Sequence, residues 1–382
     1  MAPKNTYHFN IPFSIQILIS LFLIFSFQGK SAFAQTSINA VATEFSLIKS
    51  LTRCFHSIPT ETTNFLIASD NSLSVYIYYQ AGFLESIYLP NKSKTWRTEL
   101  GGKVISQLSL DPDNKTIYLV TKSKSIMISA IDAETGITKW QFPVWSDTSP
   151  DPSEEEVFLF FHQNLLISVC RNGKILSLDK DSGNPRWNKS INSKITSNPS
   201  IFHDKLILSG ANKRIIAINI SDGLVVKQFN SSVAPKILLP LNKNEFLWTD
   251  QTGKLFFNGE QKFRAGAEIT DLISTPRGIL IVSKDNFLYL ISRTNQKRLW
   301  KKKIAGRVFP KILNFNQWVI VPVLGEKDLS IIDLENGKII NTLTIDEGNY
   351  FTGEFFIASE LLFTPTAKGL YAFATTETKC PN

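Results

Sequence analysis

The chain repeats one short phrase, and this repetition limits its fold more than any other feature. The clearest copy is ISAIDAETGITKW, which runs from Ile128 to Trp140. Alternating apolar residues lead into Asp132, and Gly136 stands between that Asp and the closing Trp140. An Asp side chain accepts hydrogen bonds from turn amides, and a Gly adopts the positive φ that a tight turn between strands needs. The phrase therefore predicts a β-hairpin whose second strand carries a large flat side chain.

Related phrases return along the whole chain at intervals of roughly 36 to 47 residues, a spacing typical of propeller blades. The residues at the repeated positions are Trp96, Trp140, Trp187 and Trp300, together with Gly136, Gly183, Gly223 and Gly337. The fifth copy is contracted to a short turn at Asn258-Gly259, and the eighth runs out at the C-terminus. We interpret the repeated tryptophans as packing residues between blades, in preference to ligand-stacking residues.

Each copy divides into short strands. Residues 195–229 can be cut into ITSNPSIF, KLILSG, RIIAINI and LVVKQF, with turn-forming residues at each boundary, and residues 268–300 can be cut in the same way. A four-stranded sheet with two apolar faces must stack against neighbours, and closing the stack into a ring removes its exposed ends. We therefore predict an all-β fold, an eight-bladed β-propeller of four-stranded antiparallel blades.

The last copy ends where its fourth strand should begin. We expect the ring to be closed by an N-terminal strand near Arg53 to Ser57, ahead of a first strand near residues 64–69. Cys54 falls at the start of this closing strand, and Cys380 falls in the turn before it, which predicts a disulfide between the two ends. The alternative is two unpaired thiols. We interpret Cys170, inside a predicted strand, as a buried apolar residue.

The N-terminus has the pattern of a secretory signal peptide. Lys4 precedes an apolar run over residues 11–27, and the small residues Ala32 and Ala34 flank the expected cleavage site. The alternative is a retained membrane anchor. Cleavage would leave a lead-in segment, 35–51, and one propeller domain, 52–382. No later stretch approaches the ~20 apolar residues of a membrane span, and no Cys stands near the cut. We expect an exported protein, periplasmic or secreted, that is not lipid-anchored.

The charge pattern argues against a nucleic-acid partner. The formal net charge is +8, and the predicted mature chain carries +6 because cleavage removes Lys4 and Lys30 and no acid. Basic residues are spread along the chain and acidic residues interleave with them, whereas nucleic-acid binders usually gather positive charge on one face. The exception is the acidic run Glu154, Glu155 and Glu156.

The repeats resemble the tryptophan-docking repeats of the PQQ-like (quinoprotein alcohol dehydrogenase-like) β-propellers. The copies that carry the resemblance are Asp132/Gly136/Trp140, Asp179/Gly183/Trp187 and the degenerate Ser292/Gln296/Trp300. This superfamily contains PQQ-dependent dehydrogenases and BamB-like non-enzymatic members, which belong to the bacterial outer-membrane barrel-assembly machine. In size the chain is more similar to the second group.

The resemblance implies that a dehydrogenase would hold PQQ with an adjacent-cysteine disulfide and a stacking tryptophan, and would hold calcium with acidic residues. This sequence has no adjacent cysteines, and its turn aspartates are explained by hydrogen bonding. His162 and His203 both end predicted first strands and show no metal-ligand spacing. We predict no catalytic residues, no metal site, and neither PQQ nor calcium as a cofactor.

The candidate binding loop is the insertion that follows Trp145 and ends at Glu154, Glu155 and Glu156. We predict an exported, non-enzymatic scaffold that binds a protein partner, with a cell-envelope role like that of the outer-membrane assembly propellers. The alternatives are a PQQ-dependent dehydrogenase, or a divergent remnant of one, and a carbohydrate-binding surface protein that uses aromatics near Trp145.

The predicted Cys54–Cys380 disulfide is tested by the intact mass of the mature protein before and after reduction. Such a long closed loop would stabilise the fold by up to ~5 kcal/mol in the chain-entropy model. Reduction should raise the mass by two hydrogens, and peptide mapping should recover one cross-linked pair that contains both cysteines. An unchanged mass would contradict the pairing.

Overall fold

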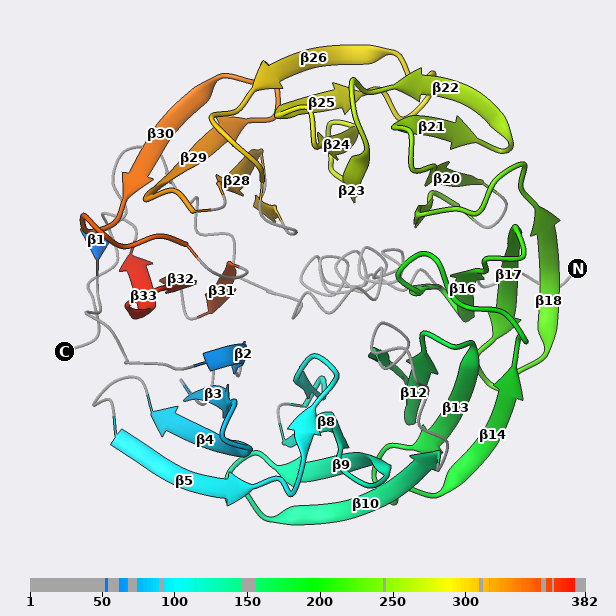
Figure 1. Cartoon of the computed structure of the whole chain (residues 1–382), viewed down its shortest axis with the longest axis vertical. Helices are drawn as coiled ribbons and strands as arrows, with labels where there is room; N and C mark the ends of the chain where they lie inside the picture. Colours follow the sequence, from blue (N-terminus) through cyan, green and yellow to red (C-terminus); the bar gives the residue numbers. More distant parts are fainter. Residues whose placement is uncertain are drawn as a thin grey trace, which may run out of the picture.

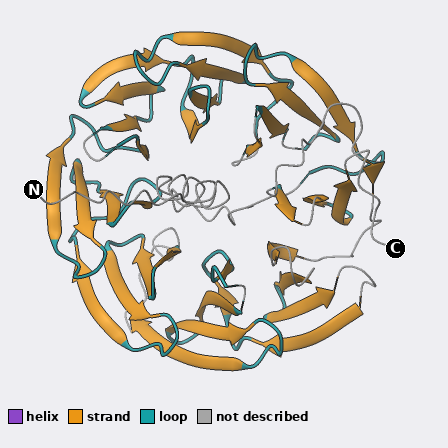
Figure 2. Ribbon diagram, turned by 180° about the vertical axis from the view of Figure 1, so that it is seen from behind, coloured by secondary structure: helices purple, strands orange, loops and turns teal. Residues whose placement is uncertain are grey.

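The computed structural model describes residues 52–53, 62–67, 74–88, 93–113, 115–145, 156–242, 245–308, 312–315, 317–323, 325–351, 355–358 and 361–374. Its strands form eight antiparallel sheets arranged in a ring (Figure 1). None of the described residues is helical, and from behind the ring consists of strands and connecting loops (Figure 2). The chain is an all-β, eight-bladed propeller, and we number its blades in chain order.

The first four blades contain the following strands. Blade 1 has β2 (Thr62–Ile67), β3 (Ser74–Tyr79), β4 (Phe83–Tyr88) and β5 (Ser93–Glu99). Blade 2 has β6 (Lys103–Val104), β7 (Ser109–Leu110), β8 (Thr116–Lys122), β9 (Ile126–Asp132) and β10 (Thr138–Trp145). Blade 3 has β11 (Val157–His162), β12 (Leu165–Cys170), β13 (Lys174–Asp179) and β14 (Pro185–Ser190). Blade 4 has β15 (Ser200–Phe202), β16 (Lys205–Ser209), β17 (Arg214–Asn219) and β18 (Val225–Asn230).

The other four blades complete the ring. Blade 5 has β19 (Ile237–Pro240), β20 (Phe246–Thr249), β21 (Lys254–Phe257) and β22 (Glu260–Arg264). Blade 6 has β23 (Ile269–Ser274), β24 (Ile279–Ser283), β25 (Phe287–Ile291) and β26 (Arg298–Lys303). Blade 7 has β27 (Leu313–Phe315), β28 (Trp318–Pro322), β29 (Asp328–Asp333) and β30 (Ile339–Thr344). Blade 8 has β31 (Phe356–Ala358), β32 (Leu361–Thr366) and β33 (Gly369–Ala374), with β1 (Thr52–Arg53) beside β33.

The fourth strands β5, β10, β14, β18, β22, β26 and β30 follow the circumference of the ring (Figure 1). Because neighbouring strands are antiparallel, the connections fall on two opposite faces. We call the face where each fourth strand ends and the next blade begins the loop face. The opposite face, which carries the hairpin turns between third and fourth strands, is the turn face.

The hydrophobic core is divided among the junctions between blades. Leu238 and Trp248 of blade 5 cluster with residues of blade 4, whereas their strand neighbours Leu239 and Leu247 cluster with residues of blade 6. Successive strand residues point to opposite faces of a sheet, so a continuous apolar run buries both faces. This explains why central strands such as β24, ILIVS, are buried along their whole length and apolar over their first four residues.

Two first strands differ in detail from the four-stranded form expected from sequence. The first strand of blade 2 is split into β6 and β7, because buried Ser106 between them accepts a bond from the amide of Val120 and bridges to Val157 of blade 3. The first strand of blade 4 begins only after Pro199, which has no N–H to donate.

The two ends of the described chain meet in blade 8. Strand β1 pairs with β33 through Thr52 opposite Ala374 and Arg53 opposite Phe373. Residues 54–57 of the predicted closing strand lie outside the described residues, as do Cys54 and Cys380. Closure by the N-terminal strand and the disulfide both stay predictions.

Each repeated tryptophan docks on the following blade. The indole Nε1–H groups of Trp96, Trp140, Trp187 and Trp300 donate to the carbonyls of Ala133 (3.1 Å), Lys180 (3.1 Å), Ile220 (2.8 Å) and Leu334 (2.8 Å). In every case the acceptor belongs to the turn that contains the next docking glycine. These four junctions join blades 1 to 2, 2 to 3, 3 to 4, and 6 to 7.

The docking glycines leave the space that the indole occupies. Gly183 has φ +73°, and a Cβ placed on it would lie 2.6 Å from Cδ2 of Trp140. The same holds for Gly136 against Trp96, Gly223 against Trp187 and Gly337 against Trp300. Glycine is therefore needed at this position for two reasons, the left-handed backbone conformation and the close approach of the indole ring.

Substitution of Gly183 by alanine tests the docking contact. We expect Gly183→Ala to lower the free energy of unfolding by about 2–4 kcal/mol, because a strained φ is combined with a clash against Trp140. The matched control is Gly101→Ala, at a glycine with φ +67° where an added Cβ would meet no atom within 4 Å, and it should lose only about 1 kcal/mol. Equal losses in urea unfolding would show that the indole contact contributes nothing.

Candidate functional site

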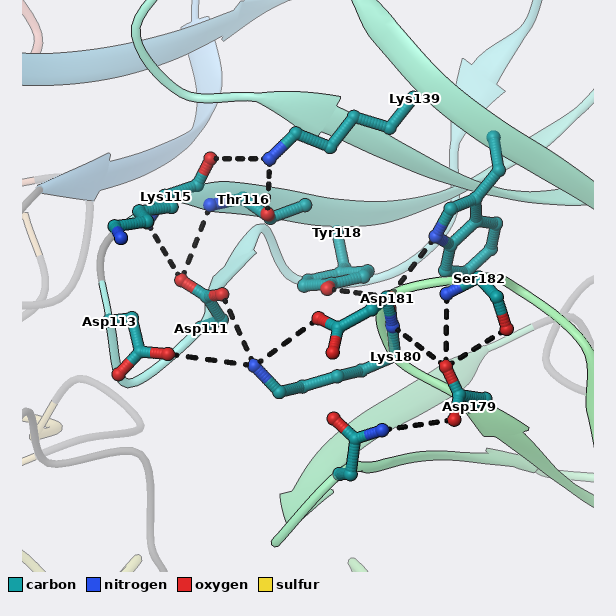
Figure 3. Close-up of polar contacts among 12 residues, drawn as sticks. Asp111, Asp113, Lys115, Thr116, Tyr118, Lys139, Asp179, Lys180, Asp181 and Ser182 are labelled. Carbon is teal, nitrogen blue, oxygen red and sulfur yellow. Dashed lines mark hydrogen bonds and ion pairs between the residues drawn. The ribbon is translucent and has the colours of Figure 1, made fainter.

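A cluster of polar contacts lies on the turn face between blades 2 and 3 (Figure 3). Lys180, in the turn after β13, extends its ammonium group towards three carboxylates. Its Nζ lies 3.6 Å from Asp111, 3.7 Å from Asp113 and 3.6 Å from Asp181. The Lys180 side chain is 12% exposed and that of Asp111 only 4%, so this pair is well shielded from water. The cluster ties the first-to-second turn of blade 2 to the docking turn of blade 3.

Two aromatic residues of blade 2 converge on the backbone of the same lysine. The hydroxyl of Tyr118 donates to the Lys180 carbonyl (2.9 Å), which also accepts the bond from the Trp140 indole (3.1 Å). The two rings pack at 5.8 Å between centroids. Burial raises the pKa of the Tyr118 phenol, so the hydroxyl stays protonated and able to donate.

Asp179 organises the docking turn of blade 3. Its Oδ1 accepts bonds from the amides of Asp181 (3.2 Å) and Ser182 (3.0 Å), and its Oδ2 accepts from Arg186 (2.7 Å) and Asn164 (2.9 Å). The Arg186 guanidinium and then the Ser182 amide hold the pKa of the Asp179 carboxyl below its usual range. In blade 2 the repeat residue Asp132 accepts the corresponding turn amides.

These contacts give the aspartates a structural role. Asp111 already accepts the amides of Lys115 (2.8 Å) and Thr116 (3.2 Å), in addition to its pairing with Lys180. Among the described residues, no three His, Cys, Asp or Glu side chains are grouped so that they could hold a metal ion. The site is suited to holding two blades together.

The candidate binding loop is described at its two ends. Trp145 ends β10, where its backbone pairs with Ile126, and Glu156 stands directly before β11. Residues 146–155, which include Glu154 and Glu155, lie outside the described residues, and so does the Trp145 side chain. The loop therefore leaves and re-enters the scaffold at two backbone-paired positions on the loop face.

Glu156 is held by Arg171, which follows β12. The Arg171 Nε donates to the Glu156 carboxylate (3.1 Å), and other guanidinium nitrogens reach Ser197 O (3.3 Å) and Asn198 Oδ1 (3.2 Å) in blade 4. The guanidinium also lies 4.7 Å from the centroid of the Phe158 ring. One arginine thus connects the end of the candidate loop to two blades.

Blade 6 contains a similar ion-pair site that the sequence repeats did not reveal. Glu268 stands before β23 and Lys284 follows β24, the same positions that Glu156 and Arg171 hold in blade 3. Glu268 pairs with both Lys284 and Lys236, and burial, followed by the nearby Lys284, lowers the pKa of Lys236. Aligning the copies at their first strands, rather than at their turns, would have revealed this acid-to-base pattern.

The remaining sequence candidates are dispersed. His162 ends β11 and His203 follows β15 with φ +54°, where its ring packs against Phe202. Trp318 is buried in the core between blades 7 and 8. Cys170 is buried between blades 2 and 3. None of these residues is brought together with the candidate loop in the described part of the chain.

Within the described residues, no helix is both long enough and apolar enough to cross a membrane.

A family model, a protein sequence and solved structures are similar to this chain. A PQQ-like family model, described as outer membrane protein assembly factor BamB, matches residues 143–343. The outer membrane protein assembly factor BamB of Francisella tularensis subsp. tularensis (strain SCHU S4 / Schu 4) is 24% identical over 242 residues, which make up 54% of this chain and 52% of that protein. The match thus spans about half the length of this curated relative.

Two solved structures share the fold. The crystal structure of BamB from Moraxella catarrhalis superposes with a TM-score of 0.62 at 16% identity, covering 86% of this chain and 99% of that one. The computationally designed Ika8 protein superposes with a TM-score of 0.65 at 12% identity, over the same shares of the two chains.

The Asp179 turn gives a prediction about pH. The folded-state pKa of this carboxyl lies below its unfolded value of about 3.9, so its stabilisation is present above that pH and is lost as the pH falls through the folded pKa. We expect Asp179→Asn to lower the free energy of unfolding by about 1–3 kcal/mol at neutral pH. In urea unfolding, the difference in free energy of unfolding between wild type and variant should become smaller below about pH 4.

The control for this experiment is Asp204→Asn, at a carboxylate that is 64% exposed and lies 4.0 Å from Lys205. Exposed pairs of this kind contribute little, so the control should stay close to wild type at every pH. If the difference in free energy of unfolding between wild type and Asp179→Asn does not change with pH, the charge of Asp179 does not contribute to stability.

Proposed function

This chain belongs to the family of the outer membrane protein assembly factor BamB, whose model matches residues 143–343, and on this basis we propose that it is an exported, non-enzymatic scaffold in outer-membrane protein assembly. The matched range begins in β10 and ends in β30, so it includes all of blades 3 to 6 and most of blade 7. The family match is the observation that carries the proposal. Its residues include the candidate loop and both ends that anchor it.

The proposed partner is another protein of the cell envelope, bound on the loop face. In support, the insertion between Trp145 and Glu156 joins two strands that are paired within rigid sheets, and Arg171 fastens its second end to two blades. Loops positioned by a rigid scaffold are the usual carriers of binding function. The acidic residues Glu154 and Glu155 would offer carboxylates to a basic partner surface.

The proposed location follows from the sequence. Residues 1–34 would be removed on export, residues 35–51 would form a lead-in segment, and residues 52–382 would form the propeller. The mature protein would act in the periplasm without a lipid anchor of its own.

The function is tested in cells of the native host that lack the chromosomal gene. A variant in which Trp145, Glu156 and residues 146–155 are replaced by a Gly-Ser linker of equal length should accumulate normally. It should fail to restore the amount of heat-modifiable β-barrel protein in the outer membrane, because the partner contact is lost while the propeller persists.

The matched control keeps Trp145, Glu154, Glu155 and Glu156 and replaces only the other loop residues. It should restore assembly if these four residues carry the binding. Full assembly by both variants would contradict the loop-face proposal. Stoichiometric PQQ and calcium binding with dye-linked oxidation of an alcohol or sugar would contradict the non-enzymatic role.

A further inference from the structure

The junction between blades 4 and 5 interrupts the series of docked tryptophans. Lys227 of β18 takes the repeat position that Trp187 holds in the preceding blade. The blade 5 hairpin that would receive an indole is contracted to Asn258-Gly259, and a Cβ on Gly259 would meet no atom within 4 Å. Both halves of the docking contact are therefore absent from the same junction.

Other aromatic residues pack the interior of this junction. Phe229 of blade 4 meets Phe246 of blade 5 edge to face at 5.2 Å, and Trp248 stacks on Phe256 at 3.9 Å within blade 5. Trp248, which lies outside the repeat position, thus supplies bulk from the opposite side of the junction. The core between the two blades is closed without a docked indole.

A cavity of about 190 Å³ remains beside this core. Its lining residues are Phe202, Lys205, Ile207, Ala217, Val226, Lys227, Asn242 and Phe246. Lys205 and Phe246 begin second strands, and Val226 and Lys227 lie near the start of the fourth strand β18, so the cavity opens on the turn face. The candidate loop after Trp145 lies on the other face.

An exposed apolar strip runs along the edge of the cavity. Leu224, Val225 and Val226 are 61%, 44% and 47% exposed. The positions equivalent to the two valines are Thr138 and Lys139 in blade 2. Neighbouring apolar residues exposed beside a cavity mark an interaction surface more often than scattered ones do. Strand β18 is also the outer edge of its sheet, where an extended segment can pair.

The described lining of the cavity is basic, and the acidic residues Asp204 and Glu245 lie just outside it. Lys205 and Lys227 are the ionisable residues of its described lining. Lys227 lies with its Nζ 4.6 Å from the centroid of the Phe229 ring, and Lys205 faces the exposed Asp204 at 4.0 Å. An exposed pair at that distance screens the lysine only weakly. The lining is therefore complementary to an aromatic side chain that has a carboxylate beside it.

We propose that this cavity and the strip Leu224–Val226 form a docking site for an extended segment of a partner protein in which an aromatic residue stands next to an acidic residue. The aromatic ring enters the space that an intramolecular indole fills at four other junctions. The carboxylate meets Lys205 and Lys227, and the backbone of the segment lies along β18. This site does not depend on the proposed role in outer-membrane assembly.

The site is tested on the purified propeller with indole-3-propionate, which carries an indole and a carboxylate. Titration followed by ligand-observed NMR should show saturable binding with a Kd of about 1 mM, as expected for a ligand of this size. The neutral indole-3-propionamide should bind about tenfold more weakly, because its amide does not pair with the lysines.

Variants of β18 locate the site. Lys227→Trp should abolish binding, because the new indole fills the cavity. Val226→Asp should weaken binding about tenfold, and the protein should stay soluble because this position is exposed. The matched control Gln228→Trp adds the same ring on the next residue, which points to the other face of the strand, and should bind as wild type does. Unchanged binding by Lys227→Trp or Val226→Asp would overturn the proposal, as would the absence of saturable binding.

A six-residue peptide, Ser-Thr-Glu-Trp-Thr-Ser with blocked ends, tests the partner segment directly. It should displace indole-3-propionate and bind more tightly than the fragment, whereas the peptide with Lys in place of Glu should not compete. Self-association in sedimentation equilibrium that Val226→Asp abolishes would assign the surface to a second copy of this chain and overturn the partner assignment.

Discussion

Four of the eight blade junctions depend on the contact between the indole of one blade and the glycine turn of the next. A sheet with two apolar faces has no stable form by itself, and stacking alone would allow neighbouring blades to slide. The indole removes this freedom because its N–H must reach one carbonyl while its ring covers one glycine, as Trp140 does at Lys180 and Gly183. The hydrogen bond fixes the orientation of the indole, and most of the stabilisation comes from the buried area of its ring.

Electrostatic contacts reinforce the same junctions without replacing the docking. At the junction of blades 2 and 3, Lys180 gathers carboxylates from both blades while its carbonyl accepts Trp140 and Tyr118. On the loop face, Arg171 plays the corresponding role between blades 3 and 4. These polar groups are largely paired with one another, so the places open to a partner are the ones where the repeat is interrupted.

The two proposed binding sites lie at interruptions of the repeat, on opposite faces of the ring. The insertion after Trp145 connects two strand ends on the loop face, where we propose that an envelope partner binds. The contracted hairpin of blade 5 leaves a cavity on the turn face, beside the exposed edge of β18. A propeller can carry two such sites because each blade junction is packed largely by its own residues. Junctions that lack a repeated indole, such as the one between blades 4 and 5, are therefore closed by their own core residues.

The sequence by itself determined the number of blades, their four-stranded form and the turn chemistry, because these depend on local periodicity and on residues such as Asp132 and Gly136 that act within one hairpin. The split of the first strand at Ser106, the ion pairs of Glu156 and Glu268, and the compensation of Lys227 by Trp248 and Phe246 were decided by the tertiary structure. Each of these features joins residues from different blades or different strands. A repeat pattern states which positions are equivalent, but the packing across each junction determines which equivalent position is filled, paired or left open.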